Sequence, residues 1–254
     1  MPSSTEQGGT EEAVRGLSAE RVSALRYNSS TIDPFESTSI IISFIKPGSR
    51  VLDIGCGTGT VSHAIRRERD IDILGIEPNR ERADAARKLG LTVIDGVYTA
   101  DIPAEHGRFD YIILADVLEH LEDPFALLAS LQDALTGEGR LIASLPNVAH
   151  WTVRLNLLRG RFDYQPTGIM DATHLRWFTK ASVTALFEAA GYEIDVITHS
   201  AGAWMPEYRR WPFSAIKEHR RPKFINWLAS RWHGLFACQH VLSAKRRTTS
   251  RLRA

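Results

Sequence analysis

The 254-residue chain has little cysteine, no long hydrophobic run and almost no net charge, and each deficit excludes a class of protein. Its two cysteines, Cys56 and Cys238, cannot form the disulfide framework of a small secreted domain. No apolar run reaches the roughly 18 residues of a membrane-spanning helix, and the polar start does not resemble a signal peptide. The sequence therefore predicts a cytoplasmic protein.

The net charge of +1 conceals a strong asymmetry along the chain. Residues 209–254 contain 12 Lys and Arg and a single acid, Glu218, whereas residues 1–208 contain 19 basic and 29 acidic residues. Four of the six tryptophans, Trp204, Trp211, Trp227 and Trp232, also lie in or just before the basic part. The last fifth of the chain is therefore expected to have a separate electrostatic role.

A strand, a glycine-rich turn and a helix follow one another near the start of the main body. Arg50–Ile54 is apolar and β-branched, which is typical of a strand buried on both faces of a parallel sheet. Gly55, Gly57 and Gly59 allow a sharp turn and close approach of a ligand, and helical spacing resumes after them. The free amides at such a helix start favour an anionic group.

A second acid-terminated strand indicates which ligand this turn binds. Ile73–Glu77 ends about 24 residues after Asp53, where a dinucleotide-type unit places the acid that binds a ribose. Thr60 stands where a nicotinamide-binding motif would have its last glycine, and the additional acid Asp53 disfavours a pyrophosphate. Because an acid beside the loop suits a cationic amino-acid end, the sequence predicts S-adenosylmethionine as the ligand.

Between about Arg50 and Ile197 the chain resembles the class I S-adenosylmethionine-dependent methyltransferases. The resemblance rests on Asp53-x-Gly55-x-Gly57-x-Gly59, on Glu77, on the strand Phe109–Asp116 and on the following Asp116–Pro124. It implies an α/β fold with a doubly wound, Rossmann-like, seven-stranded sheet whose last strand is antiparallel. The donor-binding residues that it implies are Asp53, Gly55, Gly57, Gly59, Glu77 and Asp116. Adenine contacts are not assigned, with Asp95 and Val97 the nearest candidates after the third strand.

The order of the elements divides the chain into five parts. Asp33 is expected to cap a helix that has Pro34 at its first position, and Gly234–Leu242 is expected to form the seventh strand. The expected parts are a disordered N-terminus (1–17), an N-terminal helical cap (18–47), the methyltransferase domain (48–201 and 234–246), a basic aromatic insertion (202–233) and a basic tail (247–254). The leading helices cover the cofactor in the family that the chain resembles.

Three histidines are candidates for the base that removes a proton from an acceptor hydroxyl. His120 follows the fourth strand, where sugar O-methyltransferases of similar sequence place a base, although it could also pack the loop before Asp123. Asp171 could orient His174 as a triad carboxylate orients its histidine, or both could hold the loop and cap a helix. His150 is the weaker candidate. The predicted catalytic residues are therefore His120, His174 and Asp171.

No metal ion is expected at this site. Asp116, Asp171 and His174 could converge on one, as in metal-assisted sugar methyltransferases, but no spacing in the sequence demands it. Arg154, Arg159 and Arg161 could bind an anionic group of the substrate or be solvated and ion-paired.

The stretch Pro146–Thr179 is similar to methyltransferases that accompany polysaccharide and glycoside assembly. This resemblance implies O-methylation of a sugar, a glycolipid or a related small metabolite, with a small-molecule or glycan acceptor as partner. The alternatives are an RNA or protein methyltransferase and a non-catalytic regulatory partner that binds S-adenosylmethionine.

The basic aromatic insertion has three possible roles. Phe224, Ile225, Leu228 and Trp232 are predicted to share one apolar face of a short helix, flanked by basic residues. Through residues 209–233 this helix could bind an anionic membrane surface, which would make the protein peripheral to the inner face of the membrane. It could instead pack on the sheet edge or a second subunit. RNA is the least favoured partner, because no RNA-binding module is recognised. The sequence does not indicate an oligomeric state.

Overall fold

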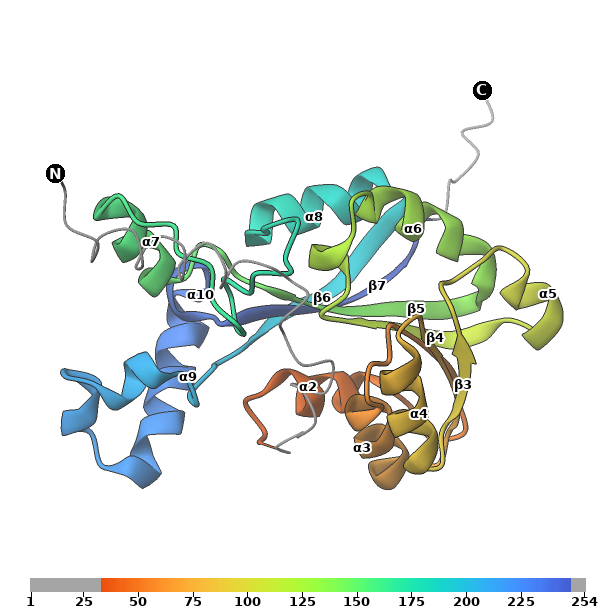
Figure 1. Cartoon of the computed structure of the whole chain (residues 1–254), viewed down its shortest axis with the longest axis horizontal. Coiled ribbons are helices and arrows are strands. Elements are labelled where there is room, and N and C mark those ends of the chain that lie inside the picture. Colours follow the sequence, from red (N-terminus) through yellow and green to blue (C-terminus); the bar gives the residue numbers. More distant parts are fainter. Residues whose placement is uncertain (1–32, 248–254) are drawn as a thin grey trace, which may run out of the picture.

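The computed structural model describes residues 33–247, which form a seven-stranded sheet with helices on both faces (Figure 1). The strands are β1 (Arg50–Ile54), β2 (Asp72–Glu77), β3 (Thr92–Asp95), β4 (Phe109–Ala115), β5 (Leu135–Pro146), β6 (Tyr192–Ser200) and β7 (Gln239–Arg246). Their order is β3-β2-β1-β4-β5-β7-β6; the first five pair in parallel, and β7 is antiparallel to both neighbours. The predicted doubly wound α/β fold with an antiparallel last strand is confirmed.

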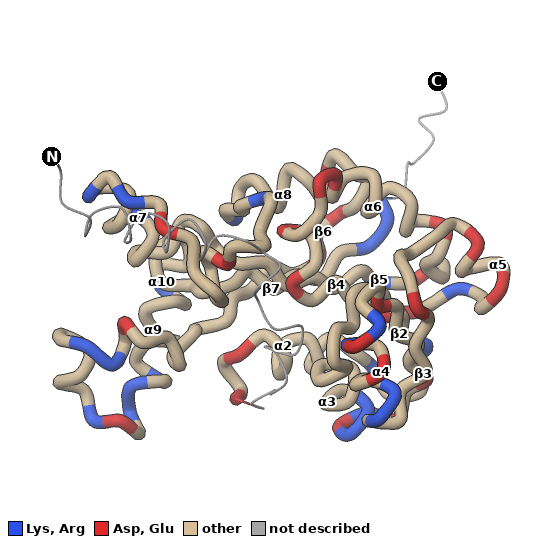
Figure 2. Tube along the Cα trace, in the orientation of Figure 1, with Lys and Arg blue, Asp and Glu red and all other residues tan. Residues whose placement is uncertain are grey.

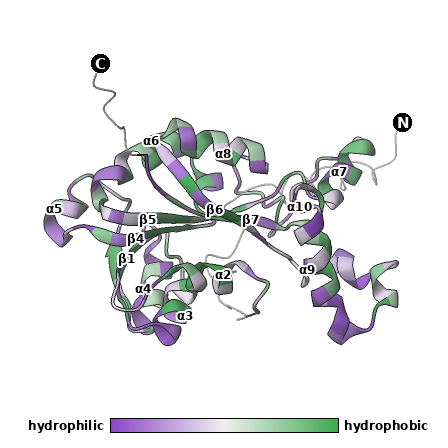
Figure 3. Ribbon diagram, turned by 180° about the vertical axis from the view of Figure 1, so that it is seen from behind, coloured by the Kyte–Doolittle hydropathy of each residue, from purple (hydrophilic) through white to green (hydrophobic). Residues whose placement is uncertain are grey.

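Two hydrophobic cores hold the helices against the two faces of the sheet. α2 (Ser37–Phe44), α3 (Thr60–Glu68) and α4 (Arg80–Lys88) pack on one face through residues such as Ile41, Ile65 and Ala86. α5 (Ile102–His106), α6 (Pro124–Ser130) and α8 (Lys180–Ala189) pack on the other face, where Leu128 and Phe187 are fully buried. The central strands β1, β4 and β5 are therefore strongly hydrophobic (Figure 3), as strands covered on both faces must be.

The helix before the first strand begins later than predicted. The carboxylate of Asp33 accepts a hydrogen bond from the amide of Phe35, and the amide of Glu36 donates to the carbonyl of Asp33. These bonds close a separate turn, so that α2 begins at Ser37 with Glu36 as its N-cap residue. The prediction that Asp33 caps this helix is wrong, because its side chain is used within that turn.

The predicted start of the seventh strand is also wrong. β7 begins at Gln239, and the preceding apolar residues form the short helix α10 (His233–Phe236). The backbone of this turn has partners outside the sheet, since the side-chain amide of Asn147 donates to the carbonyl of Ala237 at 2.9 Å. The apolar residues before Gln239 therefore connect the insertion to the loop after β5 and do not extend the strand.

The segment between β6 and β7 forms a lobe beside the sheet. It contains η4 (Pro206–Arg209), η5 (Phe213–Ala215), η6 (Glu218–Arg220), α9 (Arg221–Arg231) and α10. A third hydrophobic cluster joins this lobe to α7 (Trp151–Leu158) and the loop that follows it, and includes Val153, Met170, Tyr208 and Ile225. The lobe and the region after β5 therefore pack as one body (Figure 1).

Several sequence predictions lie outside the described residues. These are the disordered N-terminus at 1–17, the part of the helical cap before residue 33, and residues 248–254 of the basic tail. Among residues 33–247, no helix has both the length and the apolar character needed to cross a membrane.

Candidate active site

The glycine-rich turn lies at the carboxyl edge of the parallel strands and connects β1 to α3. Gly55, Gly57 and Gly59 have φ angles of 69°, 58° and 78°, in the left-handed region that favours glycine. A Cβ atom on Gly59 would lie 2.5 Å from Leu91 Cδ1 and 3.0 Å from Ala86 Cα, so α4 packs directly against the turn. The turn therefore requires glycine for both its conformation and its packing.

Two buried acids support this turn from the ends of β1 and β2. Glu77 accepts hydrogen bonds from the amides of Gly57 and Asn79, both at 2.9 Å. Asp53 accepts a hydrogen bond from Ser62 Oγ in α3, and burial raises the pKa of its carboxyl group to about 7, with the nearby charge of Glu77 adding to the shift. The structure therefore brings Asp53, Glu77 and the three glycines together, as the sequence analysis expected.

The two candidates for adenine contacts, Asp95 and Val97, lie at the end of β3 and differ in their surroundings. The carboxylate of Asp95 forms an ion pair with Arg87 at 2.6 Å, and Arg87 also pairs with Asp84. The side chain of Val97 is 68% exposed. Val97 is therefore accessible at this edge, whereas Asp95 is held by α4.

Asp116 occupies the carboxyl end of β4 in a strained backbone conformation. Its φ angle of 54° is the one positive value for a residue other than glycine in the described part of the chain, and such strain clusters at functional sites. Its carboxylate accepts hydrogen bonds from Gln239 Nε2 at 2.6 Å and Ser144 Oγ at 3.3 Å. Asp116 is an exposed residue. Desolvation by the surrounding protein nevertheless raises the pKa of its carboxyl group to about 7.

Backbone hydrogen bonds attach the loop before α8 to the short helix η2 (Leu118–His120). The amides of Leu175 and Arg176 both donate to the carbonyl of Glu119, at 2.8 and 3.0 Å. The guanidinium of Arg176 donates to the carbonyl of Glu122 at 2.6 Å. Two segments more than 50 residues apart in the sequence are thereby held side by side, and their histidines meet.

The rings of His120 and His174 lie edge to face, with centroids 4.9 Å apart. Nδ1 of His120 lies 3.1 Å from the carbonyl of Thr173, and Nδ1 of His174 lies 3.1 Å from the carbonyl of Ile169. A carbonyl oxygen can only accept, so Nδ1 is the protonated nitrogen of each ring and, in the neutral ring, Nε2 carries the basic lone pair. This arrangement suits both rings for proton transfer.

Asp171 acts on this site through Thr173. Its carboxylate accepts from the amide and the hydroxyl of Thr173, at 2.9 and 2.7 Å, and it is completely buried. Thr173 in turn accepts from His120, so these bonds connect Asp171 to the orientation of His120. The Ile169 carbonyl holds Nδ1 of His174, and the prediction that Asp171 orients His174 stays a prediction.

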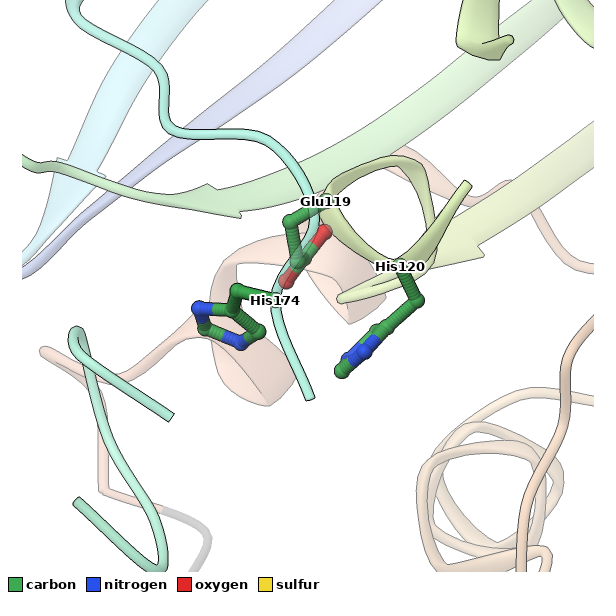
Figure 4. Close-up of side chains that lie close together, drawn as sticks. All are labelled: Glu119, His120 and His174. Atoms are coloured by element: carbon green, nitrogen blue, oxygen red, sulfur yellow. The ribbon is translucent and has the colours of Figure 1, made fainter. Parts of the chain in front are cut away.

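Glu119 completes the cluster, and the sequence analysis assigned it no role. It is 1% exposed, and neither carboxylate oxygen has a hydrogen-bond partner among the described residues. Burial, with the charge of Asp116 adding to it, raises the pKa of its carboxyl group well above the usual range. Figure 4 shows the carboxylate between the two imidazoles. Its position directly before His120 was the available signal, but the approach of His174 depends on the tertiary fold.

These three side chains could also hold a metal ion. Glu119, His120 and His174 each offer one ligand atom, and these atoms lie within 4.8 Å of one another. Both imidazoles donate Nδ1–H to a carbonyl, as metal-binding histidines usually do, and the set suits zinc or manganese. The sequence predicted no metal site, and the residues that could have converged on an ion were Asp116, Asp171 and His174. The structure brings together a different set, because η2 turns Glu119 inward.

His150, Arg154 and Arg161 have structural partners. His150 is buried, with ring nitrogens 3.0 Å from Tyr208 Oη and 2.8 Å from Thr152 Oγ1, and burial lowers its pKa to about 3. Arg154 donates to the carbonyl of Ala149, and Arg161 pairs with Asp163. His150 therefore stabilises the fold around α7.

Comparison with known proteins identifies similar chains. The profile of a family described as "Methyltransferase domain" matches residues 32–196. The ubiquinone biosynthesis O-methyltransferase of Actinobacillus pleuropneumoniae is 32% identical over 172 residues, which cover 59% of this chain and 72% of that protein. The enzyme of the same name from Aeromonas salmonicida is 28% identical over 152 residues, and the match spans 57% of this chain but only 63% of the relative.

A solved structure supports the same fold. The crystal structure of an S-adenosylmethionine-dependent methyltransferase from Thermotoga maritima superposes with a TM-score of 0.55. The match covers 94% of this chain and 96% of that one at 18% identity. At that identity, the likeness concerns the fold alone.

Proposed function

This chain belongs to the class I S-adenosylmethionine-dependent methyltransferases, and we propose that it methylates a hydroxyl oxygen of a small molecule. The observation that carries this proposal is the pair of imidazoles on either side of Glu119 at the carboxyl end of β4. A hydroxyl acceptor must lose a proton during methyl transfer, and both rings present Nε2 as a base. A site for an acceptor that needs no deprotonation would not require this arrangement.

The residues at the glycine-rich turn fit the methyl donor. Backbone at Gly55, Gly57 and Gly59 leaves room for close approach, and the buried carboxylate of Asp53 suits the cationic amino group of the donor. Glu77 is held by two amides at the end of β2, where a carboxylate binds ribose hydroxyls. Asp116 directly follows the adjacent strand β4, on the opposite side of β1 from Glu77.

The chain's own residues perform the proton transfer and the positioning. His120 Nε2 accepts the proton of the acceptor hydroxyl, while the Thr173 carbonyl holds the other ring nitrogen. When bound at the glycine-rich turn, S-adenosylmethionine would supply an electrophilic methyl group on sulfur, which an acceptor oxygen can displace in line. Orienting the two reactants can contribute roughly 7–11 kcal/mol to such a displacement.

The acceptor class that we favour is a sugar, a glycolipid or a related metabolite. The resemblance of Pro146–Thr179 to enzymes of polysaccharide and glycoside assembly supports this choice. The matched relatives are named for ubiquinone biosynthesis, which supports O-methylation of a small molecule without specifying a sugar. The alternatives remain an RNA or protein acceptor and a regulatory role without catalysis.

Transfer of labelled methyl into a host extract tests this function. The purified protein is incubated with methyl-labelled S-adenosylmethionine and extract, which is then separated into lipid, small-molecule, RNA and protein fractions. We expect the label in the lipid or small-molecule fraction, in a bond that resists the treatments that cleave methyl esters. Label in RNA or protein would contradict the proposal, and donor binding without transfer into any fraction would favour the regulatory alternative.

The cluster of Glu119, His120 and His174 leads to a prediction about metal ions. A cation held by one oxygen of Glu119 and by Nε2 of the two imidazoles would give the buried carboxylate a partner, and its Lewis-acid chemistry would then replace the imidazole base. Zinc or manganese at about 100 times its dissociation constant is expected to stabilise the fold by about 2.7 kcal/mol, or roughly 5–10 °C in melting temperature. Differential scanning fluorimetry after dialysis against a chelator measures this shift.

The matched control for that measurement is Glu119→Gln, which keeps the size of the side chain but removes its charge. This variant is expected to lose most of the metal-dependent shift. An equal shift in both proteins, or none in the wild type, would show that the cluster works without a metal ion.

A further inference from the structure

Helix α9 has one buried face and one exposed face. Ile225, Leu228 and Ala229 are buried in the lobe, whereas Phe224 and Trp227 are 38% and 54% exposed. The sequence predicted one apolar face made of Phe224, Ile225, Leu228 and Trp232. Its two aliphatic members are buried, whereas its two aromatic members are 38% and 47% exposed, so only half of this face enters the core.

The exposed aromatic side chains form a continuous group. Phe224 stacks on Trp227 with ring centroids 5.8 Å apart, and Trp227 meets Trp232 edge to face at 5.9 Å. Trp232 is 47% exposed, and Trp211 of the same lobe is 84% exposed. Such an accumulation of exposed rings on a soluble surface marks an interaction site.

Basic side chains accompany these rings on the same face. Lys223, Trp227 and Arg231 follow at spacings of four residues, so they lie in one row along α9. Arg231 lies over the ring of Trp232, 5.6 Å from its centroid. The segment 203–236 has seven Lys and Arg and two acids, and Figure 2 shows the basic positions gathered on this lobe. The lobe therefore has a net positive charge.

We propose that the exposed face of α9 and the adjoining rings bind an anionic lipid bilayer surface. Tryptophan rings prefer the headgroup region, and lysine and arginine are attracted to anionic headgroups. The helix is already packed through its inner face, so binding does not require it to fold. The lobe that carries this helix lies at one end of the molecule (Figure 1).

This surface is joined to the region of the candidate active site. The carbonyl of Ala237, directly after α10, accepts a hydrogen bond from Asn147 at the end of β5. Arg154 of α7 also contacts the carbonyl of Gly234, at 3.4 Å. Docking through the lobe would therefore hold the carboxyl edge of the sheet near the bilayer, whatever acceptor the enzyme uses.

Co-sedimentation with lipid vesicles tests this proposal without reference to methyl transfer. The full chain is expected to bind vesicles that contain phosphatidylglycerol and to bind pure phosphatidylcholine much more weakly. Neutralising Lys223 and Arg231 as K223Q/R231Q should weaken binding at least about 25-fold, since each basic residue near the surface contributes about fivefold. Higher salt should weaken the wild type in the same direction.

Matched variants elsewhere separate docking from general effects of charge and hydrophobicity. Arg67→Gln on α3 and Phe125→Ala on α6 remove an exposed cation and an exposed ring from other surfaces, and should bind as the wild type does. Trp227→Ala should weaken binding at all salt concentrations. Wild-type protein that fails to sediment with anionic vesicles would overturn the proposal. So would K223Q/R231Q that binds normally, or a lobe that binds single-stranded RNA in preference to vesicles.

Discussion

His120→Ala is expected to lower kcat for hydroxyl methylation by about 10²–10⁴-fold, the contribution of a well-placed general base. The ring's Nδ1 atom is held by the Thr173 carbonyl, which leaves Nε2 as the basic atom. Donor binding should change little, because the glycine-rich turn and Glu77 do not depend on this side chain. Steady-state kinetics with the acceptor from the labelling experiment, together with calorimetric titration of the donor, measure both effects.

His174→Ala is expected to lower kcat in the same range. The two rings are 4.9 Å apart and enclose one carboxylate, so the double variant should be far from additive. His106→Ala on α5 is the matched control and should keep full activity, because its ring contacts a surface acid outside the site. His120→Asn retains a donor for the Thr173 carbonyl, so it shows whether a loss of activity in His120→Ala comes from the missing base or from a disturbed fold. If kcat stays within tenfold of the wild type in both His120 variants, the proton leaves by another route.

The strand, turn and helix around the three glycines could be predicted from sequence because their geometry is local. The turn that contains Gly55, Gly57 and Gly59 is fixed by residues close in sequence, and Glu77 lies one strand away. The left-handed backbone conformation at these three alternate glycines is typical of a turn that a ligand approaches closely. The parallel sheet followed from the alternation of apolar strands with amphipathic helices.

The acceptor side depends on contacts that no spacing reveals. Glu119 meets His174 because two amides of the loop before α8 bond to the Glu119 carbonyl, across more than 50 residues. The bonds from the amide and hydroxyl of Thr173 to the Asp171 carboxylate are likewise not indicated by any spacing in the sequence. The apolar run before Gln239 was misread as a strand for the same reason, since its backbone bonds to Asn147 after β5.

Glu77→Ala is expected to weaken donor binding at least about 100-fold. The Glu77 carboxylate accepts two backbone amides at 2.9 Å, and hydrogen bonds to a charged group are each worth about 1.5–3 kcal/mol. Alanine leaves the amides of Gly57 and Asn79 without this acceptor and removes the group that would bind the ribose hydroxyls. Isothermal titration calorimetry with S-adenosylmethionine measures the change in Kd.

Two further variants show whether this loss comes from the carboxylate or from the turn that it supports. Glu81→Ala changes an exposed acid in the first turn of α4 and should leave Kd unchanged. Glu77→Gln keeps one oxygen for the Gly57 amide but lacks the charge, so it should retain the fold and lose part of the affinity. If Glu77→Gln binds as weakly as Glu77→Ala with an unchanged melting temperature, the charge itself is what the donor requires. If both variants bind within threefold of the wild type, Glu77 supports the turn and the ribose is held elsewhere.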